Sequence, residues 1–358
     1  MNLRASGLQE WLAAMPKAEL HLHLDGSLRP ETALELARDR DVGLDTASLD
    51  VAAIRERLIA PERCLDQAEL LRAFELPVAL LQDSESLHRA TGELVHDVAS
   101  EGTRYAEIRW APSLHTERGL SLRDVMATVT AAAARAAIDA GIEVRLIAVA
   151  LRTHDPATAT RVARTALDFI GDGLTGFDLA GIERDAPDPR RFGDAFALAR
   201  QGGLGISCHA GEWGGPQQVR GALAIKPWRI AHGAPAADDA ALCRELTALG
   251  VTLDICPTSN RQAGIGSNDH RAPLPRLIRA GVPVTVSTDD RTVSDLTLVK
   301  ELLGVVTRLG VTPTEMEALT RHAYSVAFLH HDEALRSGLL EHFEDWSSQN
   351  PAPVGASG

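Results

Sequence analysis

Cysteine is scarce in this sequence, and its spacing follows no known framework. The four cysteines, Cys64, Cys208, Cys243 and Cys256, form no C-x-x-C pair and no closely spaced set. A zinc knuckle built from thiolates and a small disulfide-stapled scaffold are therefore both excluded. Unpaired thiols are typical of a reducing compartment, which favours the cytoplasm.

Long apolar runs and an excess of basic residues are also missing. Glu10 and Lys17 interrupt the N-terminal segment before it reaches signal-peptide length, and no other stretch approaches a membrane span. Lys and Arg number 36 against 49 Asp and Glu, which gives a formal charge of -13. We expect no membrane or nucleic-acid partner, because a negative surface repels phosphate backbones. The acidity fits a small, weakly charged substrate, and it also promotes solubility by itself.

The chain has 358 residues, 45% of them hydrophobic and 24% charged, as expected for a soluble globular protein with a sizeable core. Short apolar runs alternate with Ala-, Leu- and Arg-rich segments of helical period, which is the pattern of repeated βα units. About eight runs have the length and composition of strands. They span residues 18–23, 104–110, 143–150, 174–179, 204–209, 228–232, 251–256 and 282–287. The sequence therefore predicts an α/β fold, a (β/α)8 TIM barrel.

The interval between the first two strands is about 80 residues, far longer than one crossover helix needs. We expect extra helices there, inserted over the mouth of the barrel as a substrate lid. Residues 1–346 form one predicted domain. Residues 347–358, which are rich in Ser, Pro and Gly, form a predicted disordered tail. The pattern carries no signal for a particular oligomeric state.

Metal-compatible side chains follow the predicted strands at their C-terminal ends, where barrel enzymes place their active sites. His21 and His23 are two residues apart on the first strand, so both face the barrel interior. His209 ends the fifth strand, and Glu212 follows it at a distance suited to proton exchange with a substrate. Taken alone, each of these features also fits a buried histidine or a solvated carboxylate.

The sixth and eighth strands add three more such residues. His232 precedes a glycine at the end of the sixth strand, and Asp289 and Asp290 leave the eighth strand together. Adjacent carboxylates at the end of a buried strand repel each other unless a cation or a hydrogen-bonding substrate satisfies them. A helix N-cap is the competing explanation for this pair. Nitrogen and oxygen ligands without thiolate suit a zinc ion that keeps one exchangeable position.

Six motifs occur in a fixed order between Pro16 and Leu298, and together they resemble the adenosine deaminase family of the amidohydrolase superfamily. The motifs are PKAELHLHLDGSLRPET, GFDLAG, HAGEWGG, RIAHG, CPTSN and VTVSTDDRTVSDLTL. Arg291 and the CPTSN loop depart from the animal-type pattern and resemble bacterial members. The resemblance implies one zinc ion per chain. Its ligands would be His21, His23, His209 and Asp289.

The same resemblance implies roles for the remaining residues. Glu212 would donate a proton to the purine ring, His232 would orient and deprotonate the water, and Asp290 would bind the purine side. Asp25 would contact the ribose, and Gly181 would offer its backbone amide to a ring nitrogen. His23 would also belong to the substrate-binding set. A carboxylic acid that donates at neutral pH needs a raised pKa, which we expect from burial of Glu212 beside Asp290.

The implied activity is zinc-dependent hydrolysis of adenosine, and of 2'-deoxyadenosine, to the inosine product and ammonia in purine salvage. Adenine and aminodeoxyfutalosine are alternative substrates. An esterase or lactonase of the same superfamily is the alternative of another class, but two-metal relatives of that kind need a lysine where residues 178–181 have none. The H-x-E and P-C-x-x-C pattern of nucleic-acid deaminases is absent too. Arg109 and Arg152 lie near strand ends, where a structural ion pair competes with an anion-binding role.

Overall fold

The computed structural model describes residues 3–40, 49–185, 187–266 and 271–353. Eight parallel strands follow one another around a barrel in chain order. They are β1 (Lys17–His23), β2 (Thr103–Trp110), β3 (Glu143–Leu151), β4 (Leu174–Ala180), β5 (Gly205–Ala210), β6 (Arg229–His232), β7 (Thr252–Ile255) and β8 (Val284–Val286). Each begins and ends within two residues of the range predicted from the sequence, so the predicted barrel is confirmed.

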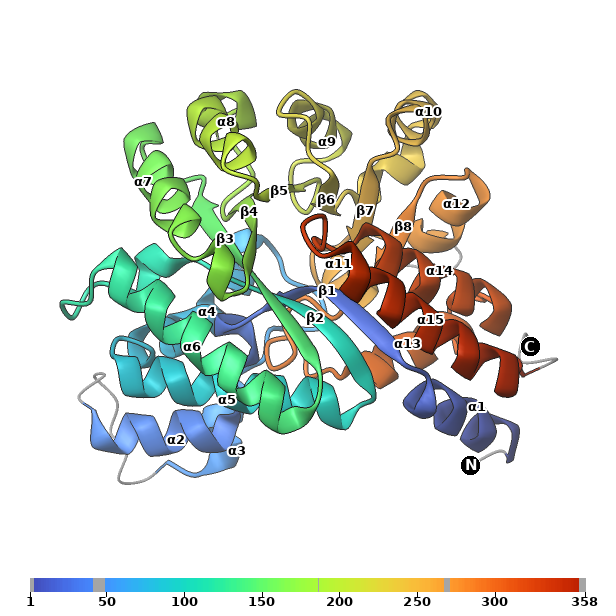
Figure 1. The fold of residues 1–358 in the computed structure, drawn as a ribbon, viewed down its shortest axis with the longest axis horizontal. Helices are drawn as coiled ribbons and strands as arrows, with labels where there is room; N and C mark the ends of the chain where they lie inside the picture. The colour runs from blue at the N-terminus through green and yellow to red at the C-terminus, as the bar shows by residue number, and fades with distance from the viewer. Residues whose placement is uncertain (1–2, 41–48, 186, 267–270, 354–358) are drawn as a thin grey trace.

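Helices surround the strands (Figure 1). They are α1 (Leu3–Ala14), α2 (Pro30–Asp39), α3 (Val51–Leu58), α4 (Gln67–Leu80), α5 (Ser84–Ser100), α6 (Leu122–Ala140), α7 (Pro156–Leu167), α8 (Gly193–Gln201), α9 (Pro216–Leu223), α10 (Ala240–Leu249), α11 (Pro257–Gln262), α12 (Pro273–Arg279), α13 (Leu298–Thr307), α14 (Pro313–Val326) and α15 (Glu333–Gln349). Short 3-10 turns are η1 (Asp25–Ser27), η3 (Pro112–His115), η4 (Ile170–Asp172), η5 (Pro189–Phe192) and η6 (Ala234–Asp238).

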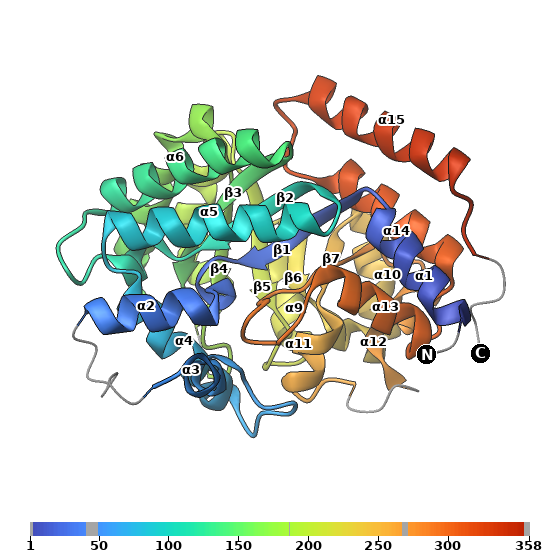
Figure 2. The same ribbon diagram turned by 90° about the horizontal axis from the view of Figure 1, so that it is seen from below.

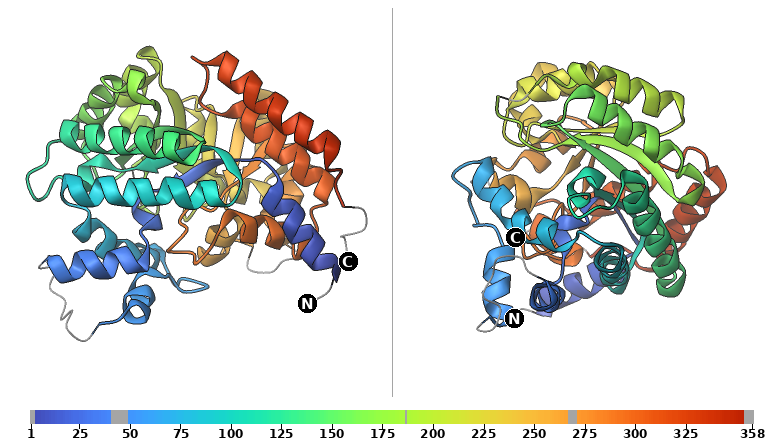
Figure 3. Two further views of the ribbon diagram at one scale, coloured as in Figure 1. Left: turned by 60° about the horizontal axis from the view of Figure 1, so that its bottom comes forward. Right: turned by 90° about the vertical axis from the view of Figure 1, so that its left-hand side faces the viewer.

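The long interval between β1 and β2 contains α2, α3, α4 and α5, which confirms the predicted helical insertion. Helices α2, α3 and α4, in blue, lie together on one side of the barrel in Figures 2 and 3. Their starts are encoded locally, because Asp50, Asp66 and Asp83 each precede a helix and accept a hydrogen bond from a backbone N–H three residues further on. The insertion is therefore an ordered layer of helices built on N-caps.

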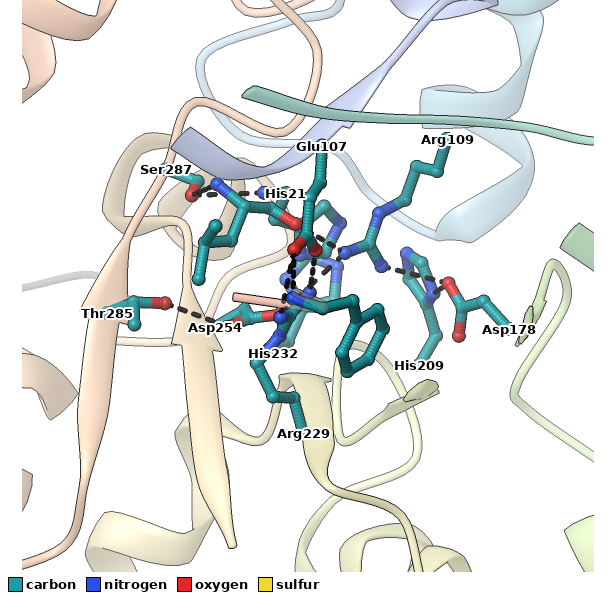
Figure 4. A network of polar contacts seen from close by, with 12 residues as sticks. His21, Glu107, Arg109, Asp178, His209, Arg229, His232, Asp254, Thr285 and Ser287 are labelled. Carbon is teal, nitrogen blue, oxygen red and sulfur yellow. Dashed lines mark hydrogen bonds and ion pairs between the residues drawn. The ribbon is translucent and has the colours of Figure 1, made fainter. Parts of the chain in front are cut away.

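The barrel interior is polar. The guanidinium of Arg229 contacts Glu107 and donates to Asp254 at 3.0 Å, and all three side chains are buried. Arg109 continues this chain of charges, since it lies 3.7 Å from Asp254 and donates to Asp178 at 2.9 Å. Figure 4 shows these side chains stacked through the barrel towards the histidines. Alternating positive and negative groups make burial of so many charges possible.

The barrel closes between β8 and β1 at Asp289. The backbone N–H of Asp289 donates to the carbonyl of His21 at 3.0 Å, and the N–H of His23 donates to the carbonyl of Asp289 at 2.8 Å. Two residues earlier, the Ser287 hydroxyl accepts a hydrogen bond from the backbone N–H of His21 at 3.2 Å. The last strand is thus joined to the first by the residues that the sequence singled out for metal binding.

The C-terminal segment corrects one expected boundary. Helix α15 continues through Gln349, three residues into the predicted tail. Ser347 donates to Glu317 at 3.1 Å, and Trp346 packs against Trp11 with ring centroids 5.7 Å apart, so the last turn is held against its neighbours. Residues 354–358 lie outside the described part of the chain. In that described part, no helix has both the length and the apolarity needed to cross a membrane.

The interior charge chain predicts a large stability loss for Glu107→Gln. The change leaves the buried Arg229 guanidinium with one carboxylate partner, Asp254, in place of two, and we expect a loss of about 2 kcal/mol or more in the free energy of unfolding. Urea denaturation followed by circular dichroism measures it. The matched control is Asp168→Asn, which breaks an exposed ion pair with Arg123 and should change stability by less than about 1 kcal/mol. Equal midpoints for the two variants would contradict this account of the interior.

Candidate metal centre and active site

Four histidines and one aspartate converge at the C-terminal ends of β1, β5, β6 and β8. The Nε2 atom of His21 lies 2.9 Å from Asp289 Oδ1, and that of His23 lies 3.4 Å from the same oxygen. The Nε2 atoms of His23 and His209 are 3.2 Å apart. His232 approaches from the other side, with Nε2 at 3.6 Å from Asp289 Oδ2. The predicted ligand set and the predicted catalytic histidine are therefore brought together around one carboxylate.

The ligand atoms of His21, His209, His232 and Asp289 all lie within 4.8 Å of one another, and His23, Asp289 and Asp290 form an overlapping group. His21 is fully buried; its Nδ1 has no hydrogen-bond partner among the described residues, and its Nε2 faces only the carboxylate of Asp289 at 2.9 Å. Buried imidazole nitrogens that face each other and a carboxylate leave electron pairs unsatisfied, and a cation satisfies them. The donor set fits zinc.

The protonation states favour the same conclusion. Burial lowers the pKa of His21 well below its ordinary value and that of His23 to about 3, and it also lowers the pKa of His232. Burial opposes ionisation of Asp289, but its contacts with His21 and His232 outweigh that effect and hold its pKa well below the usual range. Neutral imidazoles and an ionised carboxylate are the forms that bind a metal.

Two residues outside the predicted set orient these histidines. Asp178, at the end of β4, lies 2.8 Å from Nδ1 of His209, so Nε2 of that ring is directed at the cluster. The amide nitrogen of Asn260, Nδ2, lies 3.1 Å from Nδ1 of His232 and holds that ring in place. Both residues stand within motifs, GFDLAG and CPTSN, that the sequence singled out without assigning these two positions. Partners of this kind orient metal ligands and set their tautomers.

The backbone at the site adopts rare conformations. His232 ends β6, and Asp289 follows β8. Their φ values are 66° and 68°, in the left-handed region that few non-glycine residues adopt. Such strain is concentrated at functional sites, where the surrounding structure holds it. Gly26 allows a close approach, because a Cβ atom there would lie 1.8 Å from Asp290 Oδ1. The carboxyl group of Asp290 is thereby held against the start of η1.

Glu212 lines a cavity of about 300 Å³ together with Arg63, Trp213 and Arg184. Burial raises the pKa of Glu212 to about 8, as expected from the sequence. The charge that adds most to this rise comes from Asp289 rather than from the expected Asp290, because Asp289 is the ionised member of the adjacent pair.

The remaining predicted residues also lie at this end of the barrel. Burial raises the pKa of Asp25 to about 6, and burial together with the charge of Asp289 raises that of Asp290 well above its ordinary value. Asp25 lies 4.0 Å from His23 Nδ1. Gly181 follows β4 with a φ of 97° and accepts a hydrogen bond at its carbonyl from the inserted segment.

The two arginines near strand ends are structural. Arg109 forms the predicted ion pair, with Asp178, and also donates to the backbone carbonyl of Leu20 at 2.8 Å. Arg152 is buried as well, but it donates to backbone carbonyls, those of His209 at 2.8 Å and Pro187 at 3.2 Å. Neither guanidinium is directed at an anionic ligand.

A (β/α)8 barrel with histidines and an aspartate gathered at the carboxyl ends of its strands defines the class of the protein, a metal-dependent hydrolase of the amidohydrolase superfamily. The family profile described as adenosine deaminase matches residues 16–346. The chain belongs to the adenosine deaminase family, and it is accordingly an enzyme that hydrolyses carbon–nitrogen bonds.

Relatives and solved structures agree with this assignment. An adenosine deaminase from Enterococcus faecalis is 37% identical over 319 residues, covering 89% of this chain and 94% of the relative. An adenine deaminase from Arthrobacter aurescens superimposes with a TM-score of 0.84 at 28% identity, covering 94% of this chain and 100% of that structure. An N6-methyl-AMP deaminase from Arabidopsis thaliana gives a TM-score of 0.82 at 30% identity, covering 95% and 99%. The substrates named for these proteins differ in what is attached to the purine.

The contact between Asp178 and His209 predicts weaker metal binding in Asp178→Asn. The uncharged amide no longer holds the ring as strongly or raises its basicity, and we expect affinity for zinc to fall about 10- to 100-fold. Competition against a chromophoric chelator at pH 7 measures the affinity directly. The exposed Asp168→Asn variant is the control, and its affinity should equal that of the wild type. Unchanged affinity in Asp178→Asn would show that the carboxylate does not support the metal centre.

Proposed function

We propose that this enzyme hydrolyses the 6-amino group of adenosine and 2'-deoxyadenosine, producing inosine or 2'-deoxyinosine and ammonia. One observation carries the proposal: Glu212, a carboxyl group whose pKa is raised by burial, follows His209 by three residues and lies close enough to the histidine and aspartate cluster for the charge of Asp289 to contribute to that pKa. Membership of the adenosine deaminase family supports it. We further propose a role in purine salvage in the cytoplasm, which fits four cysteines that are all free thiols.

We assign His21, His23, His209 and Asp289 as ligands of one zinc ion per chain. His21 and His23 both face Asp289 Oδ1, and His209 faces His23, whereas His232 faces the other oxygen, Oδ2. This arrangement supports His21, His23 and His209 as ligands and leaves His232 to act on the attacking water. When bound, zinc supplies Lewis acidity that lowers the pKa of a water molecule to about 7.

The chain's own residues then move the protons. His232, neutral because it is buried, accepts a proton from the attacking water through Nε2. This role requires the ring proton on Nδ1, and therefore the Asn260 amide turned so that its oxygen Oδ1 faces Nδ1. The water oxygen adds to the ring carbon that carries the amine, and the adjacent ring nitrogen gains electron density. Glu212 is protonated at neutral pH and donates its proton to that nitrogen. The tetrahedral carbon then releases its amino group, which leaves as ammonia with a proton returned by His232. The hydroxyl proton on that carbon passes to the Glu212 carboxylate, which restores the acid and leaves the carbonyl of the inosine product.

Two carboxyl groups next to the cluster favour a nucleoside over a nucleotide. Asp25 and Asp290 are both buried. Burial and the nearby charge of Asp289 raise the pKa of each carboxyl group. Carboxyl groups hydrogen-bond to ribose hydroxyls, and the Asp25 carboxyl, with a pKa of about 6, is mostly ionised at pH 7 and repels a phosphate. Ribose contacts by Asp25 and His23, a ring contact by the amide of Gly181 and a purine contact by Asp290 complete the proposed substrate site.

Glu212→Gln tests the proposal most directly. The amide cannot donate a carboxylic proton, and we expect kcat for adenosine to fall at least about 100-fold while zinc content stays at one per chain. Ultraviolet absorbance follows the conversion of adenosine, 2'-deoxyadenosine, adenine, AMP and aminodeoxyfutalosine. Glu245→Gln, an exposed change on α10, should retain wild-type activity.

The substrate panel separates the alternatives. Preferential conversion of adenine, AMP or aminodeoxyfutalosine by the wild type would keep the mechanism and refute the nucleoside assignment. Zinc-loaded protein that converts no purine but cleaves an ester or lactone would refute deamination itself.

Metal removal should abolish activity and lower thermal stability together. A ligand whose free concentration is a thousand times its dissociation constant stabilises the folded state by about 4 kcal/mol. Chelation of the metal removes this stabilisation. Calorimetry on chelated protein, and again after adding one equivalent of zinc, should show a lowered and then a restored melting temperature. Full activity in chelated, metal-free protein would contradict the proposed centre.

A further inference from the structure

Gln67 joins the helical insertion to the turn that follows β4. It is the first residue of α4 and is 7% exposed. Its Nε2 donates to the carbonyl of Gly181 at 3.2 Å, and its Oε1 accepts from the backbone N–H of Glu183 at 2.8 Å. One side chain from the insertion therefore holds both ends of the Gly181 turn.

Glu183 joins that turn to the loop of the proposed catalytic acid. Its carboxylate, in a residue that is 2% exposed, accepts from the backbone N–H groups of Trp213 at 2.6 Å and Gly214 at 2.9 Å, and also contacts the N–H of Gly211. These three donors lie on both sides of Glu212 in the chain. No other carboxylate in the described part of the chain binds three backbone N–H groups of this loop.

The loop needs such a restraint. Its sequence, Gly211-Glu212-Trp213-Gly214-Gly215, is rich in glycine, and Gly211 and Gly215 have φ values of 79° and 73°. Glycine loses more conformational freedom on ordering than any other residue, so a loop of this composition is free to move unless it is held. Hydrogen bonds to an ionised carboxylate are about twice as strong as neutral ones. Glu183 thus supplies the order that the loop sequence does not.

We propose that Gln67 and Glu183 form a positioning clamp, which connects the helical insertion with the Gly181 amide and with Glu212. The inference rests on the proposed function, because Glu212 and Gly181 have their roles there. Neither clamp residue touches the metal cluster or reacts with substrate. Their effect is to keep the acid and the backbone donor at fixed positions relative to a purine ring.

Loss of the clamp should therefore lower kcat more than it raises KM. A displacement of about 1 Å at an acid that acts only in the transition state can reduce the rate about 100-fold, whereas substrate binding is spread over many contacts. Gln67→Leu keeps the side chain's volume and removes both hydrogen bonds. In Glu183→Gln, the amide group offers one acceptor oxygen to three N–H donors and directs its own N–H atoms at the others.

The control is a second buried glutamine of the same insertion. Gln82, 2% exposed, donates to the carbonyls of Val78 and Leu114, each at 2.7 Å, and accepts from the N–H of Glu117 at 3.0 Å. It fastens the connection between α4 and α5 to the segment after β2. Gln82→Leu thus removes comparable hydrogen bonds without touching the Gly181 turn or the Glu212 loop.

Two measurements on the zinc-loaded full chain test the clamp. Hydrogen exchange of the amides at residues 211–214 reports the loop without requiring activity, and steady-state kinetics with adenosine separates kcat from KM. We expect at least about tenfold faster exchange and at least about tenfold lower kcat in Gln67→Leu and Glu183→Gln. Gln82→Leu should match the wild type in both, and Glu183→Asp should recover part of the loss.

Unchanged hydrogen exchange of the loop in Gln67→Leu would contradict the clamp. Equal effects of Gln67→Leu and Gln82→Leu on kcat would contradict it too. If Glu183→Gln does not fold, Gln67→Leu decides the question alone. Wild-type protein that leaves adenosine unchanged refutes the proposed function instead, and the exchange measurement still shows whether the clamp holds the loop.

Discussion

Closure of the barrel and assembly of the metal cluster depend on the same residue. Asp289 links β8 to β1 through its backbone N–H and carbonyl, and its carboxylate meets three of the four clustered histidines. β8 has only three residues, so the last strand is joined to the first mainly by the residues that follow it, Ser287, Thr288 and Asp289. The left-handed backbone of Asp289 is held by both sets of contacts. The position of the carboxylate is therefore as rigid as the barrel.

The buried charges of the barrel interior also help to fix the position of the cluster. Buried ion pairs contribute little net stability, because desolvation offsets most of their attraction. Here the chain from Glu107 through Arg229 and Asp254 to Arg109 ends at Asp178, which directs His209. An interior of aliphatic side chains would fill the same volume without orienting a ligand. The polar interior thus serves the site, and the surrounding helices supply the apolar burial that stabilises the fold.

The helical insertion belongs to the site in the same physical sense. Through Gln67 it holds the Gly181 turn, and residues just before α4 line the cavity that contains Glu212. The differing substrates named for structural relatives of the same barrel are consistent with specificity that resides in such connecting segments. A change in the insertion can alter substrate choice while the cluster at the strand ends stays as it is.

The sequence by itself determined the barrel, the insertion and the residues that gather at the site. Apolar runs of strand length and N-cap residues are local signals, and the ends of parallel strands meet at one face of any such barrel. Only the tertiary structure decided which groups hold them. Asp178, Asn260, Glu183 and Gln67 act on partners that are between 28 and 116 residues away, and no local pattern encodes contacts at such separations. Contacts between distant segments also explain why α15 extends beyond its predicted end. They explain as well why Asp289 contributes more than Asp290 to the raised pKa of Glu212.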